Sequence, residues 1–244
     1  MDETQKLYEG KAKILYRTDD PGILVSYFKD DATAFNAQKK GEIANKGVIN
    51  CTIATYLFRL LESKGIKTHW IDTPRDREMR VQSVQIIPLE VVVRNFAAGS
   101  LCKQTGLALG TPLVPPLVEF YYKNDELGDP LLTHERIRVM DIADKAQVAE
   151  LIRLAKEINA ALQNFFQTCQ ITLVDFKLEF GQNLAGQILL ADEISPDTCR
   201  LWDQANTHEV DRVMDKDRFR QDLGKVAEAY QEVLRRILAQ VNPK

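Results

Sequence analysis

One short segment constrains the fold of this 244-residue chain more than any other. Residues 174–181 have the sequence VDFKLEFG, and as a β-strand they place Asp175, Lys177 and Glu179 on one face. The opposite face is then apolar and carries Val174, Phe176, Leu178 and Phe180. An apolar face predicts an anchor on a hydrophobic core. Three ionisable groups in a row need water or a charged ligand, so the segment indicates a cleft that handles phosphate, a metal ion, or both.

Composition limits the class of protein. The length fits one large domain or two small lobes with a substantial core. Formal net charge is only -3 and no tract of Lys or Arg occurs, so we expect no nucleic-acid partner. The longest apolar runs are too short to span a bilayer, and the N-terminus is acidic and polar, unlike a secretory signal. Four scattered cysteines without a CxxC pair indicate a reduced cytoplasmic protein, and three isolated histidines lack zinc-ligand spacing.

The first 93 residues are rich in predicted strands. Short runs of β-branched and aromatic residues occur at 12–17, 23–28, 67–72, 77–82 and 85–93. One helix interrupts them, because hydrophobic residues recur with helical spacing from Ile49 to Leu61, and Gly65 is a plausible C-terminal stop.

The rest of the chain mixes helices and strands. The pattern predicts a short helix from Gly99-Ser100 to about Gly106, a long helix after Asp144, a hairpin of residues 171–180 and 187–192, and a last helix from about Asp217 to Leu238. Because strands cluster early and helices late, the predicted class is α+β, without regular βαβ alternation. We expect a boundary near residues 84–90 that separates a β-rich lobe, 1–86, from a mixed α/β lobe, 87–244.

The predicted hairpin offers ligands for a metal ion. On an extended strand Asp175 and Glu179 lie roughly 13 Å apart, too far to share one Mg²⁺, whose oxygen ligands lie at about 2.0–2.1 Å. Glu179 needs a partner, and the returning strand offers Asp192 and Glu193. If the hairpin register brings Asp192 to the face of Glu179, the pair makes a site for a Mg²⁺–nucleotide. The alternative is a solvated strand face with weak surface ion pairs.

Two further segments suggest anion binding. Lys11 and Lys13 share one face of the first long predicted strand, beside Gly10, and can grip a polyphosphate. The alternative is a pair of exposed lysines that protect an edge strand from aggregation. In VVVRNFAAGS, residues 91–100, a buried strand leads into a helix start, where Arg94, Ser100 and free N–H groups can hold an anion. Here the alternative is a plain helix cap and a surface ion pair.

Six segments in order along the chain resemble SAICAR synthetase, the phosphoribosylaminoimidazole-succinocarboxamide synthase of purine biosynthesis. They are LYEGKAKILY at 7–16, VVVRNFAAGSL at 91–101, KNDELGDP at 123–130, LVDFKLEFG at 173–181, ADEISPDTCRLWD at 191–203 and MDKDRFRQDLG at 214–224. The resemblance spans almost the whole chain. It departs at Asn36, where some members carry an acidic residue, so the role of this loop stays open.

The resemblance implies an ATP-dependent carboxylate–amine ligase. The enzyme would join L-aspartate to the carboxylate of carboxyaminoimidazole ribonucleotide (CAIR), giving SAICAR, ADP and phosphate. We expect an acyl phosphate as intermediate, and the open alternative is a route in which the amine attacks first. The implied fold has two lobes, of which the β-rich N-terminal lobe covers ATP and is distantly like that of protein kinases. The implied partners are small molecules with Mg²⁺ as cofactor. We expect no membrane association and, if the chain is a homo-oligomer, a dimer.

The same resemblance assigns roles to residues of this chain. ATP would be bound by Gly10, Lys11, Ala12, Lys13, Gln85, Ile86, Pro88, Lys123, Glu179 and Asp192, of which Glu179 and Asp192 would also hold the metal. CAIR would be bound by Arg94, Ser100, Lys177 and Arg200, and the catalytic residues would be Asp129, Asp175 and Lys177. Lys216 and Arg220 are further candidates.

These residue types suit phosphoryl transfer, which requires positioning and charge neutralisation more than a protein nucleophile. Two alternatives remain open. A small-molecule kinase would use the same lysines and acids but would add phosphate instead of succinate to its product. A nucleotide-binding module would bind ATP without turnover.

Overall fold

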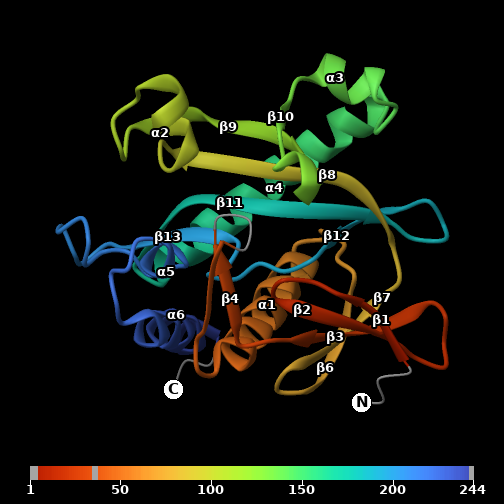
Figure 1. The fold of residues 1–244 in the computed structure, drawn as a ribbon, viewed down its shortest axis with the longest axis horizontal. Helices are drawn as coiled ribbons and strands as arrows, with labels where there is room; N and C mark the ends of the chain where they lie inside the picture. Colours follow the sequence, from red (N-terminus) through yellow and green to blue (C-terminus); the bar gives the residue numbers. More distant parts are fainter. Residues whose placement is uncertain (1–4, 35–37, 242–244) are drawn as a thin grey trace.

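The computed structural model describes residues 5–34 and 38–241. The predicted loop at Asn36 lies outside the described residues. The fold is a mixed α+β arrangement, as predicted, with two antiparallel sheets and helices packed around them (Figure 1). Among the described residues, no helix has the length and apolar character needed to cross a membrane.

The first sheet is built from the N-terminal part of the chain. Its strands, in spatial order, are β1 (Lys6–Glu9), β2 (Lys13–Arg17), β3 (Ile23–Phe28), β7 (Glu78–Gln82) and β6 (Trp70–Arg75). A separate hairpin pairs β4 (Asp31–Ala34) with β5 (Lys39–Glu42). The sequence pattern did not predict β1, β4 or β5, which are only four residues long and therefore show little alternation.

The second sheet carries the segment that dominated the sequence analysis. Its order is β10 (Leu131–Leu132), β9 (Pro112–Tyr122), β8 (Gln85–Phe96), β11 (Ile171–Gln182) and β12 (Ile188–Ala191), and β13 (Cys199–Asp203) also pairs with β11. The predicted hairpin of β11 and β12 is confirmed. The sequence analysis missed β9, whose prolines at 112, 115 and 116 argue against a strand because proline cannot donate to a ladder.

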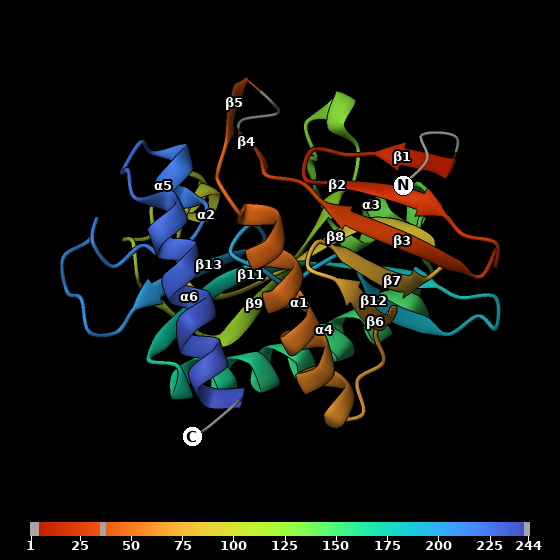
Figure 2. The same ribbon diagram turned by 90° about the horizontal axis from the view of Figure 1, so that it is seen from below.

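The helices pack against the sheets and against one another. They are α1 (Lys46–Ser63), α2 (Ser100–Thr105), α3 (His134–Val139), α4 (Lys145–Thr168), α5 (Asp217–Arg220) and α6 (Val226–Val241). Figure 2 shows α1 beside α6, with α4 running past the end of α1. The predicted start of α4 is confirmed, because Asp144 and Gln147 form a reciprocal capping box.

The prediction of one last helix is wrong in one respect, because the structure has two helices, α5 and α6, with a non-helical break between them. Asp222, Gly224 and Lys225 all have positive φ angles, of 56°, 68° and 50°. The Arg218 guanidinium is buried at this break and donates hydrogen bonds to backbone carbonyls, including those of Val213 and Gly224. The hydrophobic spacing continues across the break, so it did not reveal the turn.

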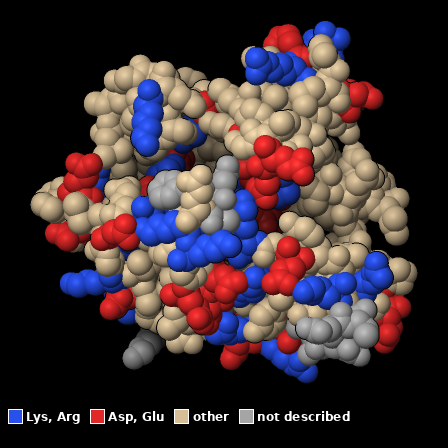
Figure 3. Space-filling model, in the orientation of Figure 1, with Lys and Arg blue, Asp and Glu red and all other residues tan. Residues whose placement is uncertain are grey.

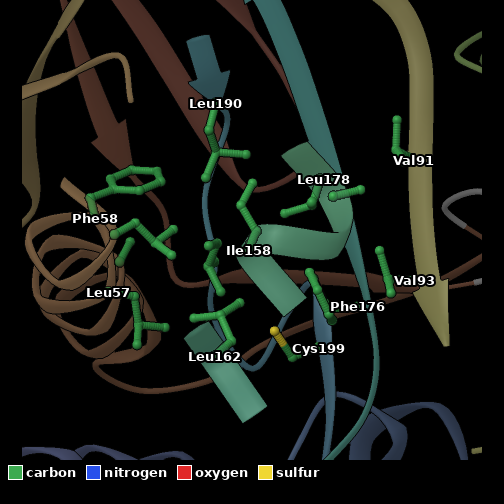
Figure 4. Packing of buried hydrophobic residues seen from close by; sticks show 14 of the residues in the cluster. Leu57, Phe58, Val91, Val93, Ile158, Leu162, Phe176, Leu178, Leu190 and Cys199 are labelled. Carbon is green, nitrogen blue, oxygen red and sulfur yellow. The ribbon is translucent and has the colours of Figure 1, made fainter. Parts of the chain in front are cut away.

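One hydrophobic cluster joins both sheets to α1 and α4 (Figure 4). Phe58 of α1, Ile158 of α4, and Phe176 and Leu178 of β11 all belong to it. The predicted lobe boundary, near residues 84–90, falls at the start of β8, just after the connection from β7. Because the core is continuous across this connection, the division into lobes of residues 1–86 and 87–244 stays a prediction.

Val174 does not share the core of its predicted neighbours. The pairing of β11 with β13 shifts register between Leu173 and Asp175, as at a β-bulge. Phe176, Leu178 and Phe180 pack in the main cluster, as predicted, but Val174 packs in a second cluster with Ala98 and Trp202. The strict alternation assumed for residues 174–180 is therefore wrong at its first position.

Candidate active site

A cavity of about 350 Å³ opens beside the charged face of β11. Its walls include Lys11, Arg94, Asp175, Lys177 and Arg200, all of them predicted site residues, together with the further candidates Lys216 and Arg220. Lys and Arg atoms gather beside Asp and Glu atoms near the centre of the face shown in Figure 3. The cavity thus brings together residues from distant parts of the sequence.

Strand register places Asp175 between two arginines. Asp175 is paired with Arg94 across to β8 and with Arg200 across to β13. Arg94 Nη1 donates to Asp175 Oδ2 at 2.9 Å, and Arg200 Nη1 donates to Oδ1 and Oδ2 at 3.0 and 2.8 Å. Asp175 is only 4% exposed. The Asp175 carboxylate therefore holds the guanidinium groups of Arg94 and Arg200 in fixed positions.

Each guanidinium is held by other residues as well. Arg94 Nε donates to Glu119 Oε2 at 2.6 Å, and its Nη2 lies 3.3 Å from Ser100 Oγ and 3.2 Å from the Tyr121 hydroxyl. Burial alone would lower the pKa of Arg94, but Asp175 and Glu119 raise it. Ser100 is the first residue of α2 and Gly99 takes the cap position, so the alternatives of a Ser100 cap and an exposed Arg94 are wrong.

We call this group the arginine end of the cavity, and it consists of Arg94, Ser100, Asp175 and Arg200. Behind it lies Asp215, which is fully buried and accepts hydrogen bonds from the backbone N–H groups of Leu201 and Asp217. Burial, reinforced by the charge of Asp217, raises the pKa of Asp215 to about 7.

A second group adjoins the cavity at Lys177, which lines its wall. We call this group the lysine end, and it consists of Lys13, Lys123, Glu179 and Asp192, none of which lines the cavity itself. Lys177 Nζ lies 2.7 Å from Glu179 Oε1 and 3.8 Å from Asp192 Oδ2. Lys123 Nζ also reaches Glu179 Oε1, at 2.8 Å, and Lys13 bonds Asp192. Burial opposes the charge of Lys177, but Glu179 and Asp192 raise its pKa well above the ordinary value. Its ammonium group is therefore protonated at neutral pH.

The two predicted metal ligands approach each other from adjacent strands. Glu179 of β11 is paired with Ala191 of β12, and Asp192 follows directly with a φ of 59°. Both carboxylates reach the same ammonium group of Lys177, so the space between them already suits a cation. Two carboxylates fit Mg²⁺, which usually takes one or two of them together with substrate phosphates.

The predicted lysine pair does not share a strand face. Lys11 lies in the turn between β1 and β2, where its Nζ pairs with Asp125 Oδ1 at 2.6 Å, while Lys13 begins β2. The turn is closed by Gly10, whose N–H donates to the Lys13 carbonyl at 2.8 Å, and the Ala12 carbonyl accepts from Lys29. Both lysines nevertheless pair with acids of the second sheet or its loops.

The other predicted site residues lie near the lysine end or away from the cavity. Gln85 and Ile86 begin β8 and are exposed, and the Pro88 carbonyl accepts from the Lys123 N–H at 3.1 Å. Asp129 has a φ of 50°, and its Oδ1 accepts from the Asn124 N–H at 2.9 Å. The structure therefore places Asp129 in a turn, not in the wall of the cavity.

Comparison with known proteins agrees with this arrangement. The family model of SAICAR synthetase matches residues 6–237. A phosphoribosylaminoimidazole-succinocarboxamide synthase of Acaryochloris marina is 65% identical over 234 residues, which cover 96% of this chain and 96% of that relative. The crystal structure of such a synthase from Ehrlichia chaffeensis is 44% identical, with a TM-score of 0.92 over 98% of this chain and 100% of that chain. A SAICAR synthetase in complex with ADP is 45% identical, with a TM-score of 0.90 over 94% and 96%.

The chain belongs to the SAICAR synthetase family. The protein is an ATP-dependent ligase of purine biosynthesis that joins L-aspartate to CAIR, which confirms the predicted family and reaction.

The candidate active site also contains residues that the sequence analysis missed. The fully buried Lys46, at the start of α1, donates to Asp197 Oδ2 at 2.6 Å, and the Tyr230 hydroxyl donates to Oδ1 at 2.7 Å. Asp197 lines the cavity, and although burial opposes its charge, Lys216 and Lys46 hold its pKa well below the ordinary value. Lys46 gave no sequence signal, because a lysine in a helical run is usually exposed.

Proposed function

We propose that the two ends of the site bind different substrates of the ligation. CAIR binds at the arginine end through its phosphate, and ATP binds at the lysine end through its phosphates. Lys177 lies between them on β11, two residues from Asp175 in one direction and two residues from Glu179 in the other. This order of three charged residues carries the proposal, because it brings the carboxylate of CAIR beside the γ-phosphate of ATP.

The arginine end has the chemistry of a phosphate site. Guanidinium groups form directed, charge-assisted hydrogen bonds to phosphate oxygens. Arg94 and Arg200 are aligned by the same carboxylate and both line the cavity, where Arg94 also donates to Ser100 and Arg200 lies against Gly99. Asp175 acts here by orienting the two arginines, and it also lines the cavity beside the imidazole of bound CAIR.

The lysine end has the chemistry of a polyphosphate site. Glu179 and Asp192 would hold Mg²⁺, which neutralises phosphate charge during transfer. Lys11, Lys13 and Lys123 add positive charge from the first sheet and from the loop after β9. Adenine then lies along the start of β8, beside Gln85, Ile86 and Pro88. The first sheet forms the ATP-covering lobe, distantly like that of protein kinases, and the enzyme works in the cytoplasm.

Ligation proceeds through an acyl phosphate. A carboxylate oxygen of CAIR attacks the γ-phosphorus of ATP, and ADP leaves. The aspartate amine then attacks the acyl carbon, an amide bond forms, and phosphate leaves with the oxygen that came from CAIR. Lys177 stays protonated and stabilises negative charge on the transferred phosphoryl group, which is where an electrostatic contribution has most effect. Its raised pKa makes it unsuited to act as a base.

Two measurements test this proposal. Purified protein should release ADP only when both CAIR and L-aspartate are present, and the product should gain the mass of a succinyl group. A product that gains phosphate instead would favour the small-molecule kinase. ATP labelled with ¹⁸O at the β–γ bridge should scramble its label with CAIR alone, because acyl phosphate formation is reversible. No scrambling, with normal ligation, would contradict the acyl phosphate.

A further inference from the structure

The orientation of Arg200 depends on Asp217, a residue of the motif at 214–224 to which the sequence analysis gave no role. Arg200 Nη1 is held by Asp175, as described above. Its Nε donates to Asp217 Oδ2 at 2.8 Å, from the short helix α5. Among the hydrogen bonds of the described residues, Nη2 of Arg200 makes none, so this nitrogen keeps both of its donors for a ligand.

Gly99 fixes the position of the same nitrogen from the other side. A Cβ atom at residue 99 would lie 2.4 Å from Arg200 Nη2 and 2.7 Å from Cζ, so any side chain there would displace the guanidinium group. The backbone of Gly99 also has a φ of 57°, which favours glycine. Arg200 is therefore enclosed by Asp175, Asp217 and Gly99, and it lines the cavity.

Net charge does not explain how this end of the cavity attracts an anion. The three arginines Arg94, Arg200 and Arg220 are bonded to three carboxylates, those of Glu119, Asp175 and Asp217. The ion pairs nearly cancel, so affinity for phosphate must come from the direction of the N–H groups that remain. A residue that sets this direction should matter as much as one that touches the ligand.

We propose that Asp217 is a positioning residue that aims Nη2 of Arg200 at the phosphate of CAIR, which rests on the proposed function. Asp217 is suited to this role because it is itself held in place. Its Oδ1 accepts from Arg220 Nη1 at 2.6 Å, and its backbone N–H donates to Asp215 Oδ1 at 2.8 Å. Both carboxylate oxygens are used, so an amide in its place would lose one arginine.

The test is steady-state kinetics of Asp217→Asn with each substrate varied. The KM for CAIR should rise about 10- to 100-fold, the value of one charge-assisted hydrogen bond, while kcat and the KM for ATP change little. The matched control is Asp203→Asn. Asp203 lies on β13, the strand of Arg200, and pairs with Arg236 Nη1 at 2.8 Å, but Arg236 does not line the cavity as Arg200 does. An unchanged KM for CAIR in folded Asp217→Asn would overturn the proposal, as would an equal rise in the control.

A second variant approaches Arg200 from the opposite side. Gly99→Ala should raise the KM for CAIR without raising that for ATP, and it should add little to the defect of Asp217→Asn in the double variant, because both changes misplace the same guanidinium group. If Asp217→Asn does not fold, Gly99→Ala alone decides. Additive defects, or a Gly99→Ala enzyme with normal KM for CAIR, would overturn the proposal.

A binding measurement separates this proposal from the proposed function. Ribose 5-phosphate should raise the melting temperature of the wild type and of Asp203→Asn, but not of Asp217→Asn. This result would support the positioning role even if the wild type failed to ligate CAIR. Equal stabilisation of all three proteins would overturn the role of Asp217 while leaving ligation intact.

Discussion

The lysine end and the arginine end of the site are both built from ion pairs around a shared carboxylate, but their cations differ in how far the donors are fixed. At the lysine end one carboxylate oxygen of Glu179 accepts from two lysines. At the arginine end one carboxylate, Asp175, accepts from Arg94 and Arg200, and each guanidinium group is fastened by a further acid. The lysines are held by charge, whereas the arginines are held in a fixed orientation.

This difference matches what each end has to do in the proposed reaction. An ammonium group is a compact charge with donors that rotate, while a guanidinium group is a planar fork with fixed donors. The phosphates of ATP change their bonding during transfer, so the lysine end needs charge that can adjust. The phosphate of CAIR takes no part in the chemistry, so the arginine end needs only to hold it in one place.

The largest effect should come from the residue that lies between the two ends. Lys177→Ala should lower turnover about 10³-fold, comparable to the loss of one preorganised group that stabilises transition-state charge. The fold should persist, because Glu179 keeps Lys123 as a partner. Circular dichroism and steady-state ADP release would check both statements.

Lys67→Ala is the control, because Lys67 is exposed and does not line the cavity. If Lys177→Ala keeps more than about a tenth of wild-type turnover, the proposed stabilisation of the phosphoryl group is wrong.

Phe176→Ala removes packing from the opposite face of β11, beneath both ends. The side chain is 1% exposed, so the change should cost about 3–5 kcal/mol of unfolding free energy. Urea unfolding followed by circular dichroism measures this cost. Val174→Ala should cost less, because fewer buried atoms are lost. If Phe176→Ala shifted the KM of only one substrate, the packing of Phe176 beneath β11 would not support both ends of the site.

The main elements of this fold could be predicted because their patterns are local. The β11–β12 hairpin shows alternation and a turn, and α4 shows a hydrophobic stripe with a capping box. The bulge at Val174 could not be predicted, since it depends on how β13 pairs with β11. The break before α6 was hidden because apolar residues at helical spacing, such as Phe219 and Leu223, continue across it.

The site was predictable in its charged residues but not in their partners. The family motifs named Arg94, Asp175 and Arg200 without indicating that register sets them side by side. Glu119 lies in a strand with three prolines that the sequence pattern concealed, and Asp217 lies in a helix of four residues. Partners of this kind are fixed by tertiary contacts, which local patterns do not report.

Exchanging the two basic residue types tests the comparison directly. Arg200→Lys should raise the KM for CAIR about 10- to 100-fold, because lysine cannot bond Asp175, Asp217 and a ligand with fixed geometry. Lys123→Arg should change the KM for ATP by less than about threefold, since its exposed site needs only a charge. Steady-state kinetics with each substrate varied measures both values.

Arg236→Lys serves as the control for the arginine exchange, because Arg236 pairs with Asp203 away from the cavity. The distinction between the two ends would be wrong if Arg200→Lys left the KM for CAIR unchanged. It would also be wrong if Lys123→Arg raised the KM for ATP as much as Arg200→Lys raises the KM for CAIR.

The smallest expected effect is a pH dependence of stability with opposite signs at the two ends. Burial, helped by Lys13, lowers the pKa of His69 from 6.5 to about 4 behind the lysine end. The unfolded chain therefore binds this proton first, and stability present above pH 6.5 is lost as pH falls toward 4. Asp215 behind the arginine end has its pKa raised from 3.8 to about 7, so it favours the folded state below 3.8 and loses that contribution as pH rises through 7.

His69→Phe isolates the contribution of His69 to the pH dependence of the unfolding free energy. The variant removes a buried Nε2 that has no hydrogen-bond partner and keeps a ring edge against Phe58. Between pH 8 and pH 5 it should lose about 1–2 kcal/mol less unfolding free energy than the wild type, whatever its absolute stability. Urea unfolding at several pH values measures this difference, and the exposed His208→Phe should match the wild type. Parallel pH profiles for His69→Phe and the wild type would mean that His69 binds its proton equally in the folded and the unfolded chain. The expected opposite pH dependence of the His69 and Asp215 contributions to stability would then be wrong.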